Sequence, residues 1–151
     1  MTKDITNLRS TLEWLKSEGD LIETDKEVNP DLEITGLQKQ FDGGPCMLFN
    51  NVKTKPNARA VTNLFGDIKV IEKMFGWSDS EERVKKVGWA IDHPTECVEI
   101  SQEDAPCQEH VITENIKPND WLTAIRHTEL ETELTIGSGI SRCLTSSICI
   151  L

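Results

Sequence analysis

The sequence lacks several features that would assign a protein to a class at once. It has no long apolar run, so no segment is suited to crossing a membrane, and its polar first ten residues do not resemble a signal peptide. Its five cysteines are an odd number without CxxC spacing, which argues against a disulfide framework and favours reduced thiols in the cytoplasm. Basic residues are also scarce: 16 Lys and Arg stand against 26 Asp and Glu, and a net charge of −10 would repel nucleic acid.

What is present suits a globular chain of 151 residues with mixed helices and strands. A first helix is predicted from about Asn7 to Glu18, because Leu8, Leu12 and Leu15 share one helical face and Gly19 is placed to end the helix. Residues 21–28 alternate apolar or small residues with charged ones, as a half-buried strand does. Asn29-Pro30-Asp31 predicts the start of a second helix that runs to about Gln40 and buries Ile34, Leu37 and Phe41.

The pattern of alternating elements continues to about residue 95. Residues 46–49 with Val52 are densely apolar without alternation, which predicts a central strand. Residues 60–64 predict a short strand, and Gly66-Asp67 begins a helix that Gly76 ends. Ser78-Asp79-Ser80-Glu81 has capping-box spacing, and Val84, Val87 and Ile91 form the apolar side of the helix that follows. The predicted fold class is therefore α/β (α+β).

The rest of the chain has a different texture. Residues 95–118 are irregular and polar, with a short strand expected at residues 110–113, and strand-like pieces dominate from Trp121 onward. This change predicts a domain boundary near residues 95–120 and the start of a β-rich second domain. The chain finishes on the apolar run Ile148 to Leu151, which resembles the interior of a sheet whose partner strands are missing.

No motif in the sequence predicts an autonomous active site. Gly137-Ser138-Gly139 lacks the following Lys and Ser/Thr of a phosphate-binding loop and the third glycine of a dinucleotide fingerprint, so we interpret it as a bend in a strand. Cys107 with His110, and His127 beside Glu129 and Glu131, would make only incomplete metal sites. There is no G-x-S-x-G nucleophile motif.

The clustered carboxylates and the tryptophans are explained more simply by structural roles than by catalysis or ligand binding. The acidic stretches at residues 78–83 and 129–133 are expected to be solvated faces and turn edges. The four tryptophans are scattered along the chain, which favours partial burial over a stacking platform; they are Trp14, Trp77, Trp89 and Trp121. The residues alone therefore predict no catalytic and no metal-binding residue in this chain.

A set of short motifs, in the same order, resembles the start of UbiD-family decarboxylases. The resemblance extends to about Ile140, and seven or eight motifs in register are specific together. The motifs are Leu8-Arg9 with Leu12 and Leu15, Gly19-Asp20-Leu21, the run from Val28 to Ile34, Gly43-Gly44-Pro45 with Leu48 to Val52, Asn63-Leu64-Phe65-Gly66, Ala105-Pro106-Cys107-Gln108-Glu109, Ile125-Arg126-His127-Thr128-Glu129 and Leu134 to Gly139.

The resemblance implies reversible decarboxylation of an aromatic or α,β-unsaturated carboxylic acid. The family uses prenylated FMN with a divalent metal, Mn or Mg, and K near the phosphate of the cofactor. It also implies an N-terminal α/β domain, here residues 1–118, followed by a split β-barrel that binds the flavin and of which residues 119–151 would be the start. A C-terminal domain serves in oligomerisation, so a homo-oligomer is a possible partner arrangement.

The functional residues of the family have few counterparts in this sequence. Gly137, Ser138 and Gly139 would approach the periphery of the cofactor, although many members have Thr at the position of Gly137. Residues 142–151 do not match the Asn-x-x-x-x-Arg strand expected next, and the metal ligands and the catalytic Glu-Arg-Glu set have no match. We therefore expect a truncated, N-terminal portion that is inactive alone and binds no cofactor by itself. The alternative is a non-catalytic module that docks on a separately encoded, barrel-bearing subunit.

Overall fold

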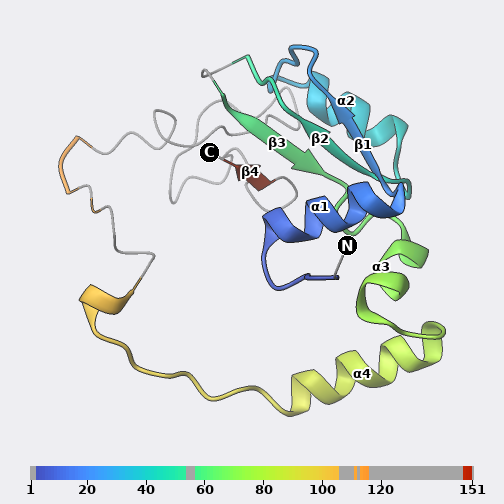
Figure 1. The fold of residues 1–151 in the computed structure, drawn as a ribbon, viewed down its shortest axis with the longest axis vertical. Coiled ribbons are helices and arrows are strands. Elements are labelled where there is room, and N and C mark those ends of the chain that lie inside the picture. Colours follow the sequence, from blue (N-terminus) through green and yellow to red (C-terminus); the bar gives the residue numbers. More distant parts are fainter. Residues whose placement is uncertain (1–2, 54–56, 106–110, 112, 116–147, 151) are drawn as a thin grey trace. The chain divides into compact units, whose positions relative to one another are not determined.

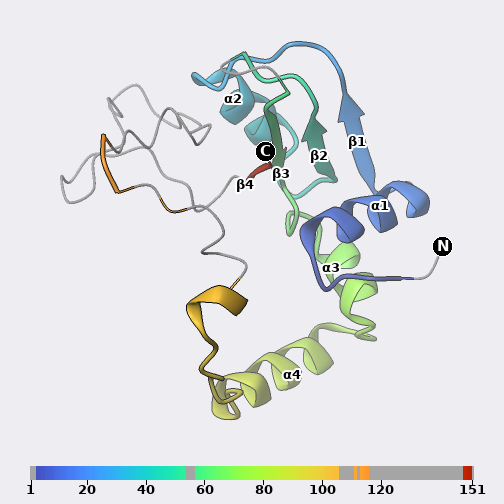
Figure 2. The same ribbon diagram turned by 60° about the vertical axis from the view of Figure 1, so that its left-hand side comes forward.

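The computed structural model describes residues 3–53, 57–105, 111, 113–115 and 148–150. These residues fall into two compact units (Figures 1 and 2). The first unit contains the sheet and three helices up to Gly76, and the second contains the helix and the 3-10 turn that follow Trp77. No described helix has the length and apolar character needed to span a membrane.

A single mixed sheet organises the first unit, with its strands in the order β1-β2-β3-β4 (Figure 1). β1 is parallel to β2, β2 is antiparallel to β3, and β3 is antiparallel to β4. The helix α2 connects β1 to β2 and supplies the crossover that a parallel pair requires. The predicted α/β class is confirmed. The strands are β1 (Leu21–Thr24), β2 (Cys46–Phe49), β3 (Arg59–Thr62) and β4 (Ile148–Ile150).

The central position of β2 was predicted correctly, because all four of its residues are buried between β1 and β3. The first strand is shorter than the predicted 21–28, and Val28 instead forms an isolated bridge with Val52. The third strand also ends early, at Thr62, because Asn63 adopts a left-handed conformation with φ of 55°. The terminal run contributes β4, whose partner β3 belongs to this same chain.

α1 (Leu8–Glu18) begins and ends where the sequence predicts. The Oδ1 of Asn7 accepts the Ser10 N–H at 3.0 Å and so caps the helix. At the other end Gly19 adopts φ of 80°, and its N–H donates to the carbonyls of Leu15 and Lys16. Because no atom of the described residues lies within 4 Å of where a Cβ would stand on Gly19, its positive φ is the feature that favours glycine there.

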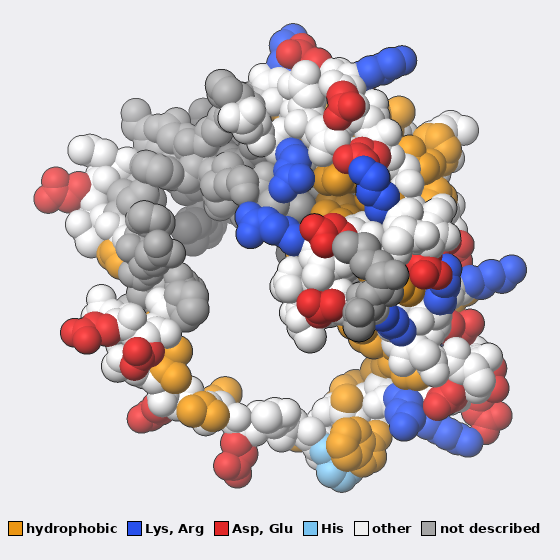
Figure 3. All heavy atoms as spheres, viewed as in Figure 1, with side chains coloured by type: hydrophobic (Ala, Val, Ile, Leu, Met, Phe, Trp, Pro, Cys, Tyr) orange, Lys and Arg blue, Asp and Glu red, His pale blue; other side chains and the backbone are white. Residues whose placement is uncertain are grey.

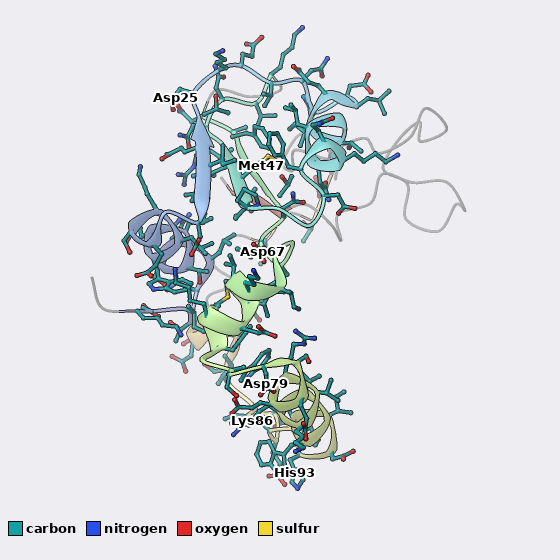
Figure 4. All side chains as sticks on the ribbon, turned by 90° about the vertical axis from the view of Figure 1, so that its right-hand side faces the viewer. Asp25, Met47, Asp67, Asp79, Lys86 and His93 are labelled. Atoms are coloured by element: carbon teal, nitrogen blue, oxygen red, sulfur yellow. The ribbon has the colours of Figure 1, made fainter. Side chains whose placement is uncertain are left out.

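The two faces of the sheet carry separate hydrophobic clusters. Alternate side chains of β2 belong to different clusters, since successive residues of a strand point to opposite faces. Cys46 and Leu48 pack with α1 and α3, whereas Met47 and Phe49 pack with Ile34 of α2. α3 (Ile68–Phe75) is capped by Asp67, which Figure 4 labels together with Met47. The first unit therefore has three layers, with α1 and α3 on one face and α2 on the other.

α2 (Glu33–Gln40) ends where the sequence predicts but begins later than predicted. Its N-cap is Leu32, in a left-handed conformation with φ of 69°, and not Asn29. The side chain of Asn29 accepts the Asp31 N–H at 2.9 Å, so it stabilises the turn before the helix. Ile34 is fully buried and Leu37 partly buried, as predicted, but Phe41 is 41% exposed. Burial of Phe41 was predicted wrongly because the helix ends at Gln40 and leaves Phe41 as its C-cap.

The second unit contains α4 (Ser80–Asp92) and the short 3-10 helix η1 (Gln102–Asp104). The capping motif is shifted by one residue from the prediction: the Oδ1 of Asp79 accepts the Glu82 N–H at 2.9 Å, and Glu82 Oε2 accepts the Ser78 N–H at 2.8 Å. No residue of α4 is buried among the described residues. Its predicted apolar side has the correct helical spacing but is exposed, with Val84 at 66% and Ile91 at 73%.

A buried hydroxyl in β3 yields a first prediction. Thr62 is 1% exposed, and its Oγ1 has no hydrogen-bond partner among the residues that the structure describes. The isosteric change Thr62→Val removes this unsatisfied group, and we expect it to raise the free energy of unfolding by about 1 kcal/mol. Urea denaturation followed by circular dichroism measures the change.

Thr11 provides a matched control for this prediction. It is 6% exposed, but its Oγ1 donates to the Asn7 carbonyl at 2.7 Å. Thr11→Val therefore removes a satisfied hydroxyl and is expected to lower stability by about 1 kcal/mol. Equal effects of the two substitutions would contradict the assignment of an orphan hydroxyl to Thr62.

Candidate functional site

Most of the residues that the sequence analysis considered for chemistry lie outside the described residues. These include the predicted cofactor-edge residues Gly137, Ser138 and Gly139, and the second acidic stretch, 129–133. They also include Cys107, His110, His127 and Trp121. The predicted domain boundary at residue 118 and the strand-like pieces after Trp121 lie there too. In the part of the chain that the structure describes, no group of three His, Cys, Asp or Glu residues could hold a metal ion.

The described candidate residues have structural roles. Asp79 and Glu82 cap α4, and hydrogen bonds from the Glu82 and Ser78 N–H groups lower the pKa values of Asp79 and Glu82 respectively. Glu81 pairs with Lys85 one turn along. The interpretation of residues 78–83 as a solvated, capping stretch is confirmed. Figure 4 shows Asp79 at the start of α4 and His93 at its end.

Two of the tryptophans have described and contrasting environments. Trp14 is 5% exposed in the core cluster of α1, as predicted, and the ammonium groups of Lys3 and Lys73 lie 5.3 and 5.8 Å from its ring centre. Lys73 also bridges Glu18 and Asp20 at 2.9 and 2.8 Å, so it links α3 to the end of α1. Trp89, in contrast, is 59% exposed and stacks on His93 with ring centres 4.6 Å apart.

A pocket of about 210 Å³ lies between α1 and the sheet, entirely within the first unit. Its apolar lining comes from one helix and two strands: Leu12 of α1, Leu21 of β1 and Leu48 of β2. Its charged lining comes from the same helix and from β1 and β3; these residues are Arg9, Glu13, Lys16, Glu23 and Arg59. In the region between α1 and the sheet, Figure 3 shows basic side chains in blue beside hydrophobic surface in orange.

The fold explains why these side chains meet. Arg9, Glu13 and Lys16 follow the i, i+4, i+7 spacing of one helical stripe, next to the apolar stripe that packs on the sheet. Leu21 and Glu23 are two apart in β1 and therefore share a face. Register places Leu48 of β2 opposite Glu23, so both lie on the α1 side of the sheet.

An ion pair at the rim uses two of the five charges. Lys16 Nζ lies 2.5 Å from Glu23 Oε2, and Asn50 Nδ2 donates to Glu23 Oε1 at 2.9 Å. The hydrogen bond from Lys16 lowers the pKa of Glu23, and Glu23 in turn raises the pKa of Lys16. Asn50 also donates to Asp25 at 2.9 Å, which holds its amide in place. Glu23 is therefore ionised at neutral pH and has its partners.

Arg59 acts on this arrangement only through its charge, which helps to lower the pKa of Glu23. It is half-buried at the start of β3, and its guanidinium makes no ion pair with any residue that the structure describes. Arg9 is exposed on α1 and has an interaction of its own. The sequence analysis did not predict this pocket, because no spacing rule brings its residues together. Arg9 and the three lining leucines do belong to the motifs quoted for the family resemblance, but those motifs do not include Glu23 or Arg59.

The cysteines have two described environments. Cys46 is 2% exposed in β2, and burial raises the pKa of its thiol to about 12. Cys97 is exposed, and both thiols are free.

Comparison with protein families finds a match, over residues 12–91, to the 3-octaprenyl-4-hydroxybenzoate carboxy-lyase N-terminal domain, UbiD_N. This match begins within α1 and continues through most of α4. Among curated proteins, the chain is 30% identical over 122 residues to the gallate decarboxylase of Lactiplantibacillus plantarum, which is 74% of this chain and 25% of that protein.

Solved structures show the same likeness in three dimensions. The UbiD-class enzyme HmfF from Pelotomaculum thermopropionicum, in complex with prFMN, superposes with a TM-score of 0.68 at 33% identity. The closed form of the vanillic acid decarboxylase of Sedimentibacter hydroxybenzoicus gives 0.69 at 27% identity. The superpositions cover 80% and 85% of this chain but 28% and 29% of those chains. The chain thus spans about a quarter to under a third of the length of these relatives.

Proposed function

Because the chain belongs to the UbiD carboxy-lyase family and corresponds to its N-terminal portion, we propose that it supplies the α/β domain of a decarboxylase that acts reversibly on an aromatic or α,β-unsaturated carboxylic acid. The observation that carries the proposal is the family match over residues 12–91, which spans both hydrophobic clusters of the sheet. The domain would extend to residue 118, with residues 119–151 as the start of a split barrel.

The complete enzyme would use prenylated FMN with a divalent metal, Mn or Mg, and K. The likeness to HmfF in complex with prFMN supports this cofactor. When bound, the modified flavin would accept the electron pair left when carbon dioxide departs. The described residues offer no cluster that could hold the metal, so we assign them no step of the reaction. Gly137, Ser138 and Gly139 remain our proposal for the periphery of the cofactor.

A cytoplasmic location is proposed from the odd cysteine count without CxxC spacing.

We expect the chain to be inactive alone, and a set of three proteins tests the proposal. They are this chain, the L. plantarum gallate decarboxylase without its matching N-terminal portion, and a chimaera in which residues 1–118 replace that portion. Each is supplied with prenylated FMN, Mn²⁺ and K⁺, and carbon dioxide release from gallate is measured. Only the chimaera is expected to be active. Activity of the isolated chain would overturn the expected inactivity, and a folded but inactive chimaera would overturn the domain assignment.

A second candidate function is that of a non-catalytic subunit that docks on a separately encoded, barrel-bearing polypeptide. The exposed apolar side of α4 favours it, since Val84, Val87 and Ile91 are 66%, 44% and 73% exposed. Size-exclusion chromatography of the chain with the truncated gallate decarboxylase tests this alternative, and the same column reports a homo-oligomer. Stable co-elution that Val87→Asp abolishes would support docking, whereas co-elution unaffected by this change would argue against the α4 surface.

A further inference from the structure

We propose that the pocket between α1 and the sheet is a binding site for a small organic carboxylate with an apolar body. The carboxylate would bind Arg59, and the apolar body would lie on Leu12, Leu21 and Leu48. This inference goes beyond the proposed decarboxylation, because it needs neither the flavin nor any residue outside the described part of the first unit.

The first support is the state of Arg59. A half-buried guanidinium has lost part of its hydration, and no described residue replaces that hydration with an ion pair. Its planar fork of donors matches the two oxygens of a carboxylate, which gives short, charge-assisted hydrogen bonds. Glu23, on the same face, is engaged by Lys16 and Asn50. The charge of Arg59 also acts on Glu23 and helps to lower its pKa, but no described ion pair joins the two side chains, so the donors of the guanidinium remain available to a ligand.

The second support is the apolar floor. Leu12 and Leu48 are only 6% and 5% exposed, so they are held by the core and present a rigid surface to the pocket. The volume of about 210 Å³ equals roughly seven liquid water molecules. That volume suits a single-ring or short-chain acid, and the leucines would gain little from a fully hydrated inorganic anion.

The other charges of the lining do not oppose the proposal. The charges of Lys16 and Glu23 cancel in their ion pair. The remaining charges of the lining are two positive, on Arg9 and Arg59, and one negative, on Glu13. Glu13 is exposed on α1, where water and salt screen its repulsion of an anion. An amphiphilic monoanion therefore meets both a cationic and an apolar partner within one pocket.

NMR titration of the full chain with four probes tests the proposal. The probes are sodium benzoate, the neutral isostere benzamide, acetate, which lacks a ring, and inorganic phosphate. We expect benzoate to shift the backbone amide signals of Leu12, Leu48 and Arg59 in a saturable manner, with at least tenfold weaker effects from the other three. Similar shifts from benzamide would show that Arg59 does not select the anion. Similar shifts from phosphate would show that the leucine side chains of the pocket contribute nothing to binding. Either result would overturn the proposal.

Substitution provides an independent arm. Arg59→Gln is expected to weaken benzoate binding at least tenfold, and Arg59→Lys, which keeps the charge but loses the fork, should give an intermediate affinity. Arg83→Gln is the matched control, because it removes the same charge from α4, outside the pocket, and should leave binding unchanged. Unchanged binding by a folded Arg59→Gln protein would refute the site. None of these readouts depends on decarboxylation, so the two proposals can fail separately.

Discussion

Leu15→Ala is expected to lower the free energy of unfolding by 2–5 kcal/mol, on the basis of measured large-to-small substitutions in protein cores. Leu15 is fully buried in the cluster that joins α1 and α3 to Cys46, Leu48 and Val61 of the sheet. The substitution removes three carbon atoms from a site enclosed by three elements, so the neighbours can close only part of the cavity. Domains commonly have about 5–15 kcal/mol of stability, so this single change would remove a large share.

Urea denaturation followed by circular dichroism measures this effect, and a matched substitution gives the control. Phe65→Ala also shortens a large apolar side chain, but Phe65 is 60% exposed. A change within about 0.5 kcal/mol is expected for the control, as for most surface substitutions. Comparable losses from both substitutions would mean that α1 does not pack on the sheet as described.

The sequence predicted those parts of the fold whose determinants are local. The bounds of α1 depend on Asn7 at one end and Gly19 at the other, and both residues act within a few positions of themselves. The central position of β2 depends on a run of apolar residues that only a strand covered on both faces accommodates. In each case the short-range pattern and the long-range packing agree.

The wrong predictions arose where two local signals competed. Ser78 and Asp79 can both cap a helix, and each is followed three residues later by a glutamate, so the sequence supports two capping registers. The structure uses Asp79, and Ser78 instead donates to Glu82. At α2, Asn29 resembles an N-cap, yet its side chain closes a turn and the helix begins at Glu33. Only three-dimensional packing decides such cases.

The pocket could not be predicted from the sequence, for a physical reason. Arg9, Glu23 and Arg59 come from a helix, a first strand and a third strand, and no spacing rule connects them. Their meeting depends on the register that pairs β1 with β2 and β2 with β3. The motifs quoted for the family resemblance include Arg9 and the three lining leucines, but neither Glu23 nor Arg59. They therefore contain the apolar part of the lining without showing that the two charged strand residues join it.

In the folded chain, the rate of alkylation of Cys46 is expected to be several orders of magnitude lower than that of Cys97. The thiolate is the reactive form, and a pKa of about 12 leaves only about one Cys46 in 10⁴ ionised at pH 8. Its 2% exposure restricts the reagent as well. Iodoacetamide labelling followed by peptide mass spectrometry measures both cysteines in one sample. In guanidinium chloride the two rates should become similar, and rapid native labelling of Cys46 would contradict its place in β2.

The same thiol should make stability fall at alkaline pH. Because burial raises the pKa of Cys46 above the value of about 8.5 for an unfolded chain, the unfolded state loses its proton first as pH rises. The stabilising contribution is complete below about pH 8.5 and declines by about 1.4 kcal/mol per pH unit until the folded pKa of about 12 is reached. Urea denaturation at pH 7, 9 and 10 tests this slope against Cys46→Ala, which is less stable at every pH but lacks this ionisation. A parallel decline in both proteins would show that Cys46 does not carry the effect, whereas a shallower decline in Cys46→Ala is the expected result.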